Sequence, residues 1–131
     1  MKYLLDTNVF LWSNGAPEKL NRQATTVLSS ASSEVYLSAA SSWEIAIKFA
    51  LRTLRLPSPP SQFVPDALRI LSIHSLEISH FHALAAGGLP PHHRDPFDRM
   101  LIAQASSEEM VLLTADKVFA RYDIETLFCG K

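Results

Sequence analysis

The sequence predicts an α/β fold, a single-domain α/β/α sandwich with a central parallel sheet that spans residues 1–131. Two observations predict it. Short apolar runs recur at three places along the chain, and longer segments with helical spacing separate them. A strand buried on both faces has a continuous apolar sequence, and strands that alternate with helices form right-handed crossovers onto a parallel sheet. A chain of 131 residues has the length of one domain.

Three segments have the composition of core strands. The first is "KYLLD", residues 2–6, and "EVYLSAA" (34–40) and "MVLLTAD" (110–116) resemble it in length and composition. The tail "YDIETLF", residues 122–128, is a candidate for a further short strand. These segments define the predicted sheet.

Helical spacing marks the segments between the strands. One face of the first helix carries Leu20, Ala24, Val27 and Leu28, and residues 43–50 form a broad apolar surface in another. "FVPDALRIL" (63–71) and "FHALAAGGL" (81–89) add two more, the second with a C-cap at Gly87. Trp12 and Trp43 are expected in the core. No internal repeat or interdomain linker divides the chain.

Composition places the chain among ordinary globular domains and limits its partners. Apolar residues make up 47% and charged residues 19%, and twelve basic against thirteen acidic residues give a net charge of −1. Any nucleic-acid binding must therefore come from a local feature. Cys129 is the only cysteine, which excludes a disulfide framework and fits a reducing compartment. Since no segment has the length of a signal peptide's apolar region or a membrane span, a cytoplasmic protein without membrane contact is expected.

Two acids stand at the ends of predicted strands. Asp6 ends the first strand and Asp116 ends "VLLTAD". Ligands of open parallel sheets gather outside the carboxyl ends of the strands, so these two side chains are well placed to meet. Each acid would equally suit a turn cap, because Asp is favoured there in any case.

Two further acids lie near predicted helix starts. Ser41 and Glu44 match the S-x-x-E capping box, which would put the Glu44 carboxylate in the first turn of a helix after the second strand. In "RDPFDRM", Asp95 suits the N-cap, Pro96 suits the first helical position and Asp98 the third. Capping explains Asp95, which is given a supporting role, and function is favoured for Asp98.

Taken together, the four acids Asp6, Glu44, Asp98 and Asp116 predict a metal site. Two unit charges ~4 Å apart repel by about 4 kcal/mol at an effective dielectric of 20, so such a cluster needs a cation. Carboxylate oxygens select a hard ion, and Mg²⁺ or Mn²⁺ is therefore expected.

Neighbouring polar residues are candidates for supporting or substrate-binding roles. His92 and His93 are expected to be solvated or to contact substrate rather than to ligate metal. Arg94 and Arg99 could pair with the acids or hold a phosphate, and the sequence does not distinguish between these two roles. Near the strand ends, a ligand or water could be oriented by Thr7, Asn8 and Thr114.

With these residues in place, the chain resembles the PIN-domain family, and within it the VapC-type toxins of toxin–antitoxin pairs. Four stretches carry the resemblance in the family's order: "YLLDTNVFLW", "VYLSAASSWEIAIK", "HHRDPFDRMLIAQA" and "LLTADKVFARY". The resemblance covers nearly the whole chain. It departs at Asn8, where close relatives often have His.

The resemblance implies a PIN-like α/β/α fold, bound Mg²⁺ or Mn²⁺ and endoribonuclease activity on an RNA substrate. The family's acids fall on Asp6, Glu44, Asp98 and Asp116. We interpret Asp6, Asp98 and Asp116 as ligands of one or two metal ions, directly or through water. Glu44 either orients the attacking water or completes the shell of a second ion. The family also implies a homodimer and a cognate antitoxin whose C-terminal segment occludes the site.

Other functions remain as alternatives. The strongest is a non-catalytic PIN-like domain that binds RNA or protein, since intact ligands do not prove turnover. A phosphatase of the haloacid dehalogenase type needs a second Asp where this chain has Asn8, and a phosphorylated receiver domain needs an acidic pair that "LLDTN" does not offer.

Overall fold

The computed structural model describes all 131 residues and is built around a five-stranded sheet. The strand order is β3-β2-β1-β4-β5, and every neighbouring pair is parallel. The strands are β1 (Lys2–Leu5), β2 (Glu34–Ser38), β3 (His74–Leu76), β4 (Val111–Thr114) and β5 (Thr126–Phe128). The predicted α/β class with a central parallel sheet is confirmed.

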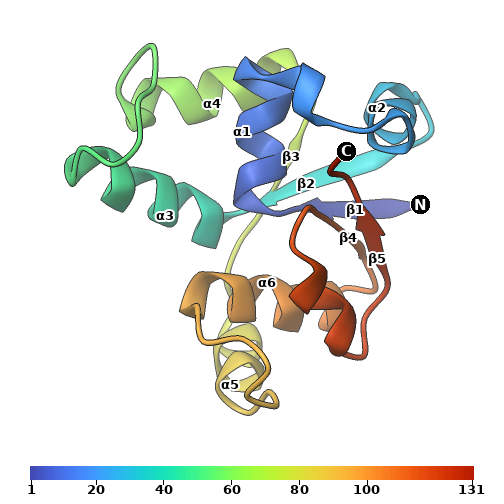
Figure 1. The fold of residues 1–131 in the computed structure, drawn as a ribbon. Coiled ribbons are helices and arrows are strands. Elements are labelled where there is room, and N and C mark those ends of the chain that lie inside the picture. Colours follow the sequence, from blue (N-terminus) through green and yellow to red (C-terminus); the bar gives the residue numbers. More distant parts are fainter.

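Helices cover both faces of this sheet. In Figure 1, α1, α2 and α4 lie above the sheet and α5 and α6 below it. The helices are α1 (Thr7–Gly15), α2 (Arg22–Ser29), α3 (Ala39–Ala50), α4 (Pro60–Ile70), α5 (His80–Gly87) and α6 (Pro96–Ser107), with short 3₁₀ turns η1 (Pro17–Lys19) and η2 (Lys117–Arg121). None of the helices is both long and apolar enough to span a bilayer.

The apolar strands supply one core on each face. Leu5 and Leu113 belong to a cluster of 13 buried residues that includes side chains of α1, α2, α3 and α4. Their neighbours Leu4 and Leu112 belong to a second cluster of 8, packed against α6 and η2. Successive strand residues point to opposite faces, so a run such as "KYLL" must be apolar throughout when helices cover both sides. This is the physical basis of the sandwich.

Some elements differ from the sequence-based expectations. Helix α1 and strand β3 were not predicted: α1 begins directly after β1 because Asp6 caps it, and β3 is a three-residue edge strand with two exposed side chains. Strand β2 ends at Ser38 instead of residue 40, because the Ser38 hydroxyl accepts a hydrogen bond from the Ala40 N–H and starts α3 there. The expected capping box at Ser41 and Glu44 is therefore wrong. Trp43, expected in the core, is 63% exposed.

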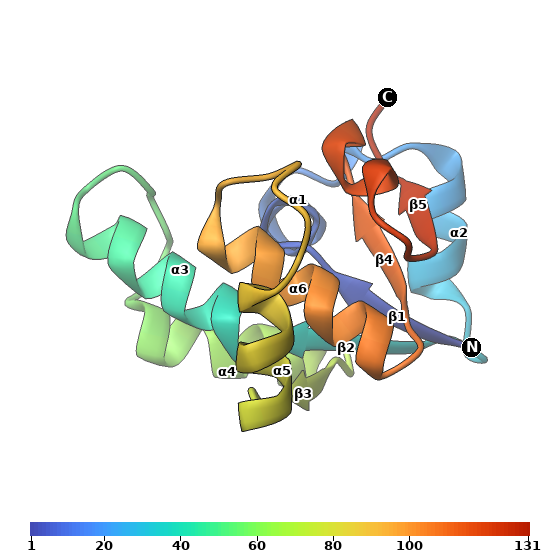
Figure 2. The same cartoon turned by 90° about the horizontal axis from the view of Figure 1, so that it is seen from below.

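The strand register determines where the site forms. Leu5 of β1 pairs with Leu37 of β2 on one side and with Leu113 of β4 on the other. The carboxyl ends of these three strands are therefore neighbours, and α1 and α3 begin there. Figure 2 shows α6 lying beside α3 and under β1 and β4. Four chain segments that are far apart in sequence thus reach one edge of the sheet.

Candidate functional site

A polar pocket of about 170 Å³ opens at this edge. All but one of its nine lining residues are polar or charged. They are Asp6, Thr7, Asn8, Glu44, Lys48, Asp95, Asp98, Asp116 and Phe119. The four acids expected to gather at one edge therefore do lie together, joined by Asp95. We call this the acid pocket.

Asp6 is held rigidly at the floor of the acid pocket. One carboxylate oxygen, Oδ1, accepts a hydrogen bond from the Val9 N–H (2.7 Å) and caps α1. The other, Oδ2, accepts from the Thr114 hydroxyl (2.6 Å). The side chain is buried, and burial raises the pKa of Asp6 to about 6 even though these hydrogen bonds lower it. Thr114 thus contacts the acid itself and fixes its orientation.

Glu44 reaches the pocket from the second turn of α3. It is buried, and each of its two carboxylate oxygens has a donor: the Thr7 hydroxyl at Oε1 (2.6 Å) and the Lys48 ammonium at Oε2 (2.7 Å). The hydrogen bond to Glu44 raises the pKa of Lys48. Sequence reasoning passed over Lys48, although its i+4 spacing from Glu44 on one helix face was a usable signal.

Asp95 and Asp98 begin α6 as the sequence indicated. Asp95 Oδ1 accepts from the N–H groups of Phe97 (2.8 Å) and Asp98 (3.1 Å), and Pro96 follows at the first helical position. Asp98 is unlike a free surface acid. Burial first, and then the charges of Asp95, Glu44, Asp6 and Asp116, raise its pKa to about 8. Without a cation, this carboxyl carries a proton at neutral pH.

Asp116 lies at the open side of the pocket. Its Oδ1 accepts from the Val118 N–H (3.0 Å) and caps η2, and its side chain is 45% exposed. The Asp116 N–H donates to the Thr114 hydroxyl (3.0 Å), the same hydroxyl that contacts Asp6. Thr114 therefore links the two acids that follow β1 and β4.

His93 also belongs to this group, contrary to the expectation of a solvated loop residue. Its Nε2 lies 3.0 Å from Asp98 Oδ2 and 3.3 Å from Asp116 Oδ2. The side chain is only 17% exposed. Its position in the sequence, five residues before Asp98, could have indicated this contact. The loop that holds His93 must turn back toward the pocket so that Asp95 can cap α6.

Arg94 in the loop and Arg99 in α6 form no ion pair with the acids of the pocket. Arg99 donates to the carbonyl oxygens of Ala86, Leu89, Pro90 and His93 at 2.9 to 3.2 Å, so its guanidinium ties the loop to the end of α5. The expected ion pair between Arg99 and the acids is therefore not formed in this structure. Arg94 is exposed, and Asn8 is an exposed residue at the pocket wall. Lys48 is the one Lys or Arg that lines the acid pocket.

The chemistry of the donors fits a hard divalent cation. Five carboxylates converge on one pocket, and one ammonium is too little to neutralise them. Oxygen atoms of carboxylates are the ligands that Mg²⁺ and Mn²⁺ prefer, whereas a zinc site would show thiolates or several imidazoles. His93, Asp98 and Asp116 also bring possible ligand atoms within 4.8 Å of one another.

Comparison with known proteins places the chain in a family. A model of the PIN domain matches residues 3–125. Ribonuclease VapC16 of Mycobacterium tuberculosis is 44% identical over 48 residues, which is 37% of this chain and 34% of that protein. The chain thus matches about a third of the length of this curated relative.

Solved structures with the same fold extend over the whole chain. VapBC2 from Rickettsia felis, bound to a DNA fragment from its promoter, aligns with a TM-score of 0.69 and 16% identity over 99% of this chain and 100% of that one. VapBC-1 from nontypeable Haemophilus influenzae aligns with a TM-score of 0.65 and 20% identity over 98% of both chains. FitAcB from Neisseria gonorrhoeae gives 0.64 and 21%, over 95% of this chain and 96% of that one. At these identities the likeness concerns the fold, and together with the match over residues 3–125 it leads to one conclusion: the chain belongs to the PIN domain family.

Proposed function

We propose that this protein is a Mg²⁺- or Mn²⁺-dependent endoribonuclease, the toxin of a toxin–antitoxin pair. One observation carries the proposal: Asp6, Glu44, Asp98 and Asp116 come from four separate segments and line one pocket of about 170 Å³. Membership of the PIN family and the partial match to a ribonuclease support it. An acid cluster of this kind opposes folding unless a cation occupies it, which favours a functional reason for keeping it.

The side chains divide into two roles in this proposal. Asp6, Asp98 and Asp116 supply the oxygen ligands for the cation. A bound divalent ion supplies Lewis acidity, which lowers the pKa of a coordinated water and neutralises charge on the phosphate. Glu44 orients the attacking water, because the Thr7 hydroxyl and the Lys48 ammonium fix its carboxylate. Lys48 adds a positive charge at the rim, where the substrate's phosphate backbone approaches.

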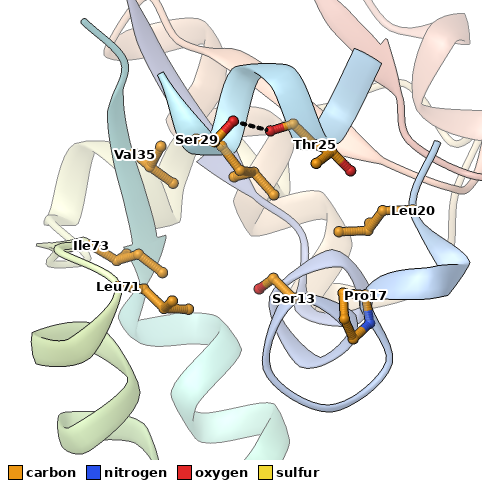
Figure 3. A pocket seen from close by; sticks show the side chains of 9 residues that line it. Ser13, Pro17, Leu20, Thr25, Ser29, Val35, Leu71 and Ile73 are labelled. Carbon is orange, nitrogen blue, oxygen red and sulfur yellow. Dashed lines mark hydrogen bonds between the residues drawn. The ribbon is translucent and has the colours of Figure 1, made fainter. Parts of the chain in front are cut away.

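The partner is proposed to be an antitoxin that covers the acid pocket, with the toxin as a homodimer. A toxin–antitoxin complex from Klebsiella pneumoniae is among the solved structures with this fold, which supports such a partner. The chain also offers a second pocket of about 210 Å³ between α1, α2 and the segment before β3 (Figure 3). Its lining consists of Ser13, Pro17, Leu20, Thr25, Leu28, Ser29, Val35, Leu71 and Ile73. We call it the apolar pocket, and it suits an apolar side chain of the antitoxin.

Cleavage of RNA in the presence and absence of metal tests the function. Purified protein is incubated with total RNA in Mg²⁺ or in EDTA, and the 5′ ends of the products are mapped. Fragments with defined ends in Mg²⁺ alone are expected, and the Asp98→Asn variant should give none. Asp123→Asn is a matched control, because Asp123 is exposed and lies outside the acid pocket.

The same experiment separates the alternatives. RNA that is retained by the protein but stays intact would indicate a non-catalytic binding domain. Fragments in EDTA at the rate seen in Mg²⁺ would exclude a metal-dependent nuclease.

A further inference from the structure

His93 is held more firmly than a loop residue usually is. Its N–H donates to the Tyr122 hydroxyl (2.8 Å), and its carbonyl oxygen accepts from the Arg99 guanidinium (3.2 Å). Its ring packs against Phe119 with the ring centres 5.7 Å apart. The backbone and the ring are therefore fixed from η2 and α6, and the imidazole has one orientation toward the acid pocket.

A second contact determines which ring nitrogen carries the proton. The Asp95 N–H donates to His93 Nδ1 at 3.2 Å. A backbone N–H can only donate, so Nδ1 must present its lone pair. The ring proton then lies on Nε2, because a proton on Nδ1 would set two N–H groups against each other.

The Nε2 atom lies close to two acids. Nε2 is buried, 3.0 Å from Asp98 Oδ2 and 3.3 Å from Asp116 Oδ2, and it is well aligned with neither oxygen. A protonated nitrogen has no lone pair for a metal ion. For Nε2 to become a ligand, the ring would have to give up this proton or Nδ1 would have to lose its contact with the Asp95 N–H.

We propose that His93 is a positioning residue of the metal site: its neutral ring places Nε2–H within 3.0 and 3.3 Å of Asp98 and Asp116, holds these carboxylates by electrostatic attraction at the spacing that a divalent cation requires, and does not itself ligate the cation. The inference rests on the proposed function, since it concerns the same cation. By distance alone, His93 would count as a third possible ligand beside Asp98 and Asp116. The inference gives it a different role. Hydrogen-bond partners of metal ligands typically change metal affinity by about 10- to 100-fold when removed.

Mn²⁺ binding measured by isothermal titration calorimetry tests the affinity. We expect His93→Ala to bind Mn²⁺ about 10- to 100-fold more weakly than the unmodified protein. His93→Gln keeps an N–H donor near the position of Nε2, and its affinity should lie clearly closer to that of the unmodified protein. His80→Ala, a change of an exposed histidine on α5, should leave the affinity unchanged. Equal Mn²⁺ affinity for His93→Ala, or no Mn²⁺ binding by the unmodified protein, would overturn the inference.

Two spectroscopic measurements test directly where the His93 ring proton lies and whether the ring binds the cation. Nitrogen correlation spectra of the metal-free protein should show the His93 ring proton on Nε2, and electron spin-echo spectra of bound Mn²⁺ should show no directly coordinated nitrogen. A proton on Nδ1, or a nitrogen ligand that disappears in His93→Gln, would contradict the proposal. These measurements need no His93→Ala protein, so they decide the matter even where that variant fails to fold.

The binding tests contain no RNA, so they stand apart from the nuclease proposal. If the protein leaves RNA intact but its Mn²⁺ affinity depends on His93, the proposed nuclease activity is rejected. The proposed positioning role of His93 then still stands.

Discussion

The acid pocket and the apolar pocket are of similar size and are both lined by helix α1, but they differ in chemistry. The acid pocket, about 170 Å³, has one apolar residue among its nine lining residues, whereas the apolar pocket, about 210 Å³, has five. Thr7 at the first turn of α1 lines the former, and Ser13 near the last turn lines the latter. In Figure 3, Leu71 and Ile73 face Ser13 and Leu20 across the apolar pocket.

The difference shows which pocket opposes the stability of the fold. Apolar side chains around a small pocket still lose most of their contact with water, and folding gains from this burial. The acid pocket gathers carboxylates of like charge, two of which have a pKa raised to about 6 and about 8. Since a raised carboxyl pKa means that the ionised form is disfavoured in the folded state, the acid pocket reduces stability at high pH. Substitutions that alter one pocket and leave the other intact should therefore have different consequences.

The largest expected effect is the loss of RNA cleavage in Asp6→Asn. Asparagine can still cap α1, so the fold should remain, but one of the proposed charged ligands of the cation is lost. The cation contributes several kcal/mol to the transition state and ~1.36 kcal/mol corresponds to a tenfold change, so we expect at least about a 100-fold slower cleavage. Initial rates on a labelled RNA measure this. A rate equal to that of the unmodified protein would exclude Asp6 from the site.

A smaller effect is expected at the apolar pocket. Leu71 is 41% exposed at its mouth, and Leu71→Asp would place a charge where an apolar side chain of the antitoxin is proposed to bind. We expect a Kd for the antitoxin that is roughly fivefold to tenfold higher, from the loss of about 1 kcal/mol of apolar burial. RNA cleavage without antitoxin should stay the same. Ile70→Asp, a neighbouring exposed position outside the pocket, serves as the control, and equal losses in both variants would contradict a specific contact.

A third expected effect, which concerns the acid pocket alone, is a pH dependence of stability in EDTA. The folded-state pKa values of Asp6 (about 6) and Asp98 (about 8) lie above the ordinary value of 3.8. Between about pH 4 and pH 8, the folded state therefore binds more protons than the unfolded state, and the free energy of unfolding falls as the pH rises. Urea unfolding at pH 5, 7 and 8.5 measures this. In Asp98→Asn the decrease near pH 8 should disappear, and a free energy that rises over this range would contradict the raised pKa values.

The sheet and the acids were predictable from sequence because local patterns encode them. Continuous apolar runs identified β1, β2 and β4, and the register of parallel strands then brings Asp6 and Asp116 to one edge. Asp95 was predicted as an N-cap because the sequence around Pro96 determines that geometry locally. Helix α1 escaped prediction, since its apolar side chains have no clear helical periodicity and its start depends on the Asp6 cap.

Contacts between distant segments could not be read in the same way. The Arg99 guanidinium donates to four carbonyl oxygens, one of α5 and three of the loop that follows it, and no spacing rule reveals this. The place of His93 depends on Tyr122 and Phe119, which follow it by more than 25 residues. Trp43 was expected in the core because of its size, but it stands 63% exposed next to the buried Glu44. Tertiary packing, not local pattern, determines these three positions.

The acid pocket is proposed to destabilise the fold when it is empty and to stabilise it when a cation is bound. Thermal unfolding of the unmodified protein and of Asp98→Asn at pH 8.5, each in EDTA and in saturating Mg²⁺, measures this most directly. In EDTA the variant should unfold at the higher temperature, because it lacks one ionised carboxylate. In Mg²⁺ the unmodified protein should gain stability, the variant should gain little, and the order should reverse. A variant that is less stable in EDTA, or that gains as much from Mg²⁺ as the unmodified protein, would contradict the account.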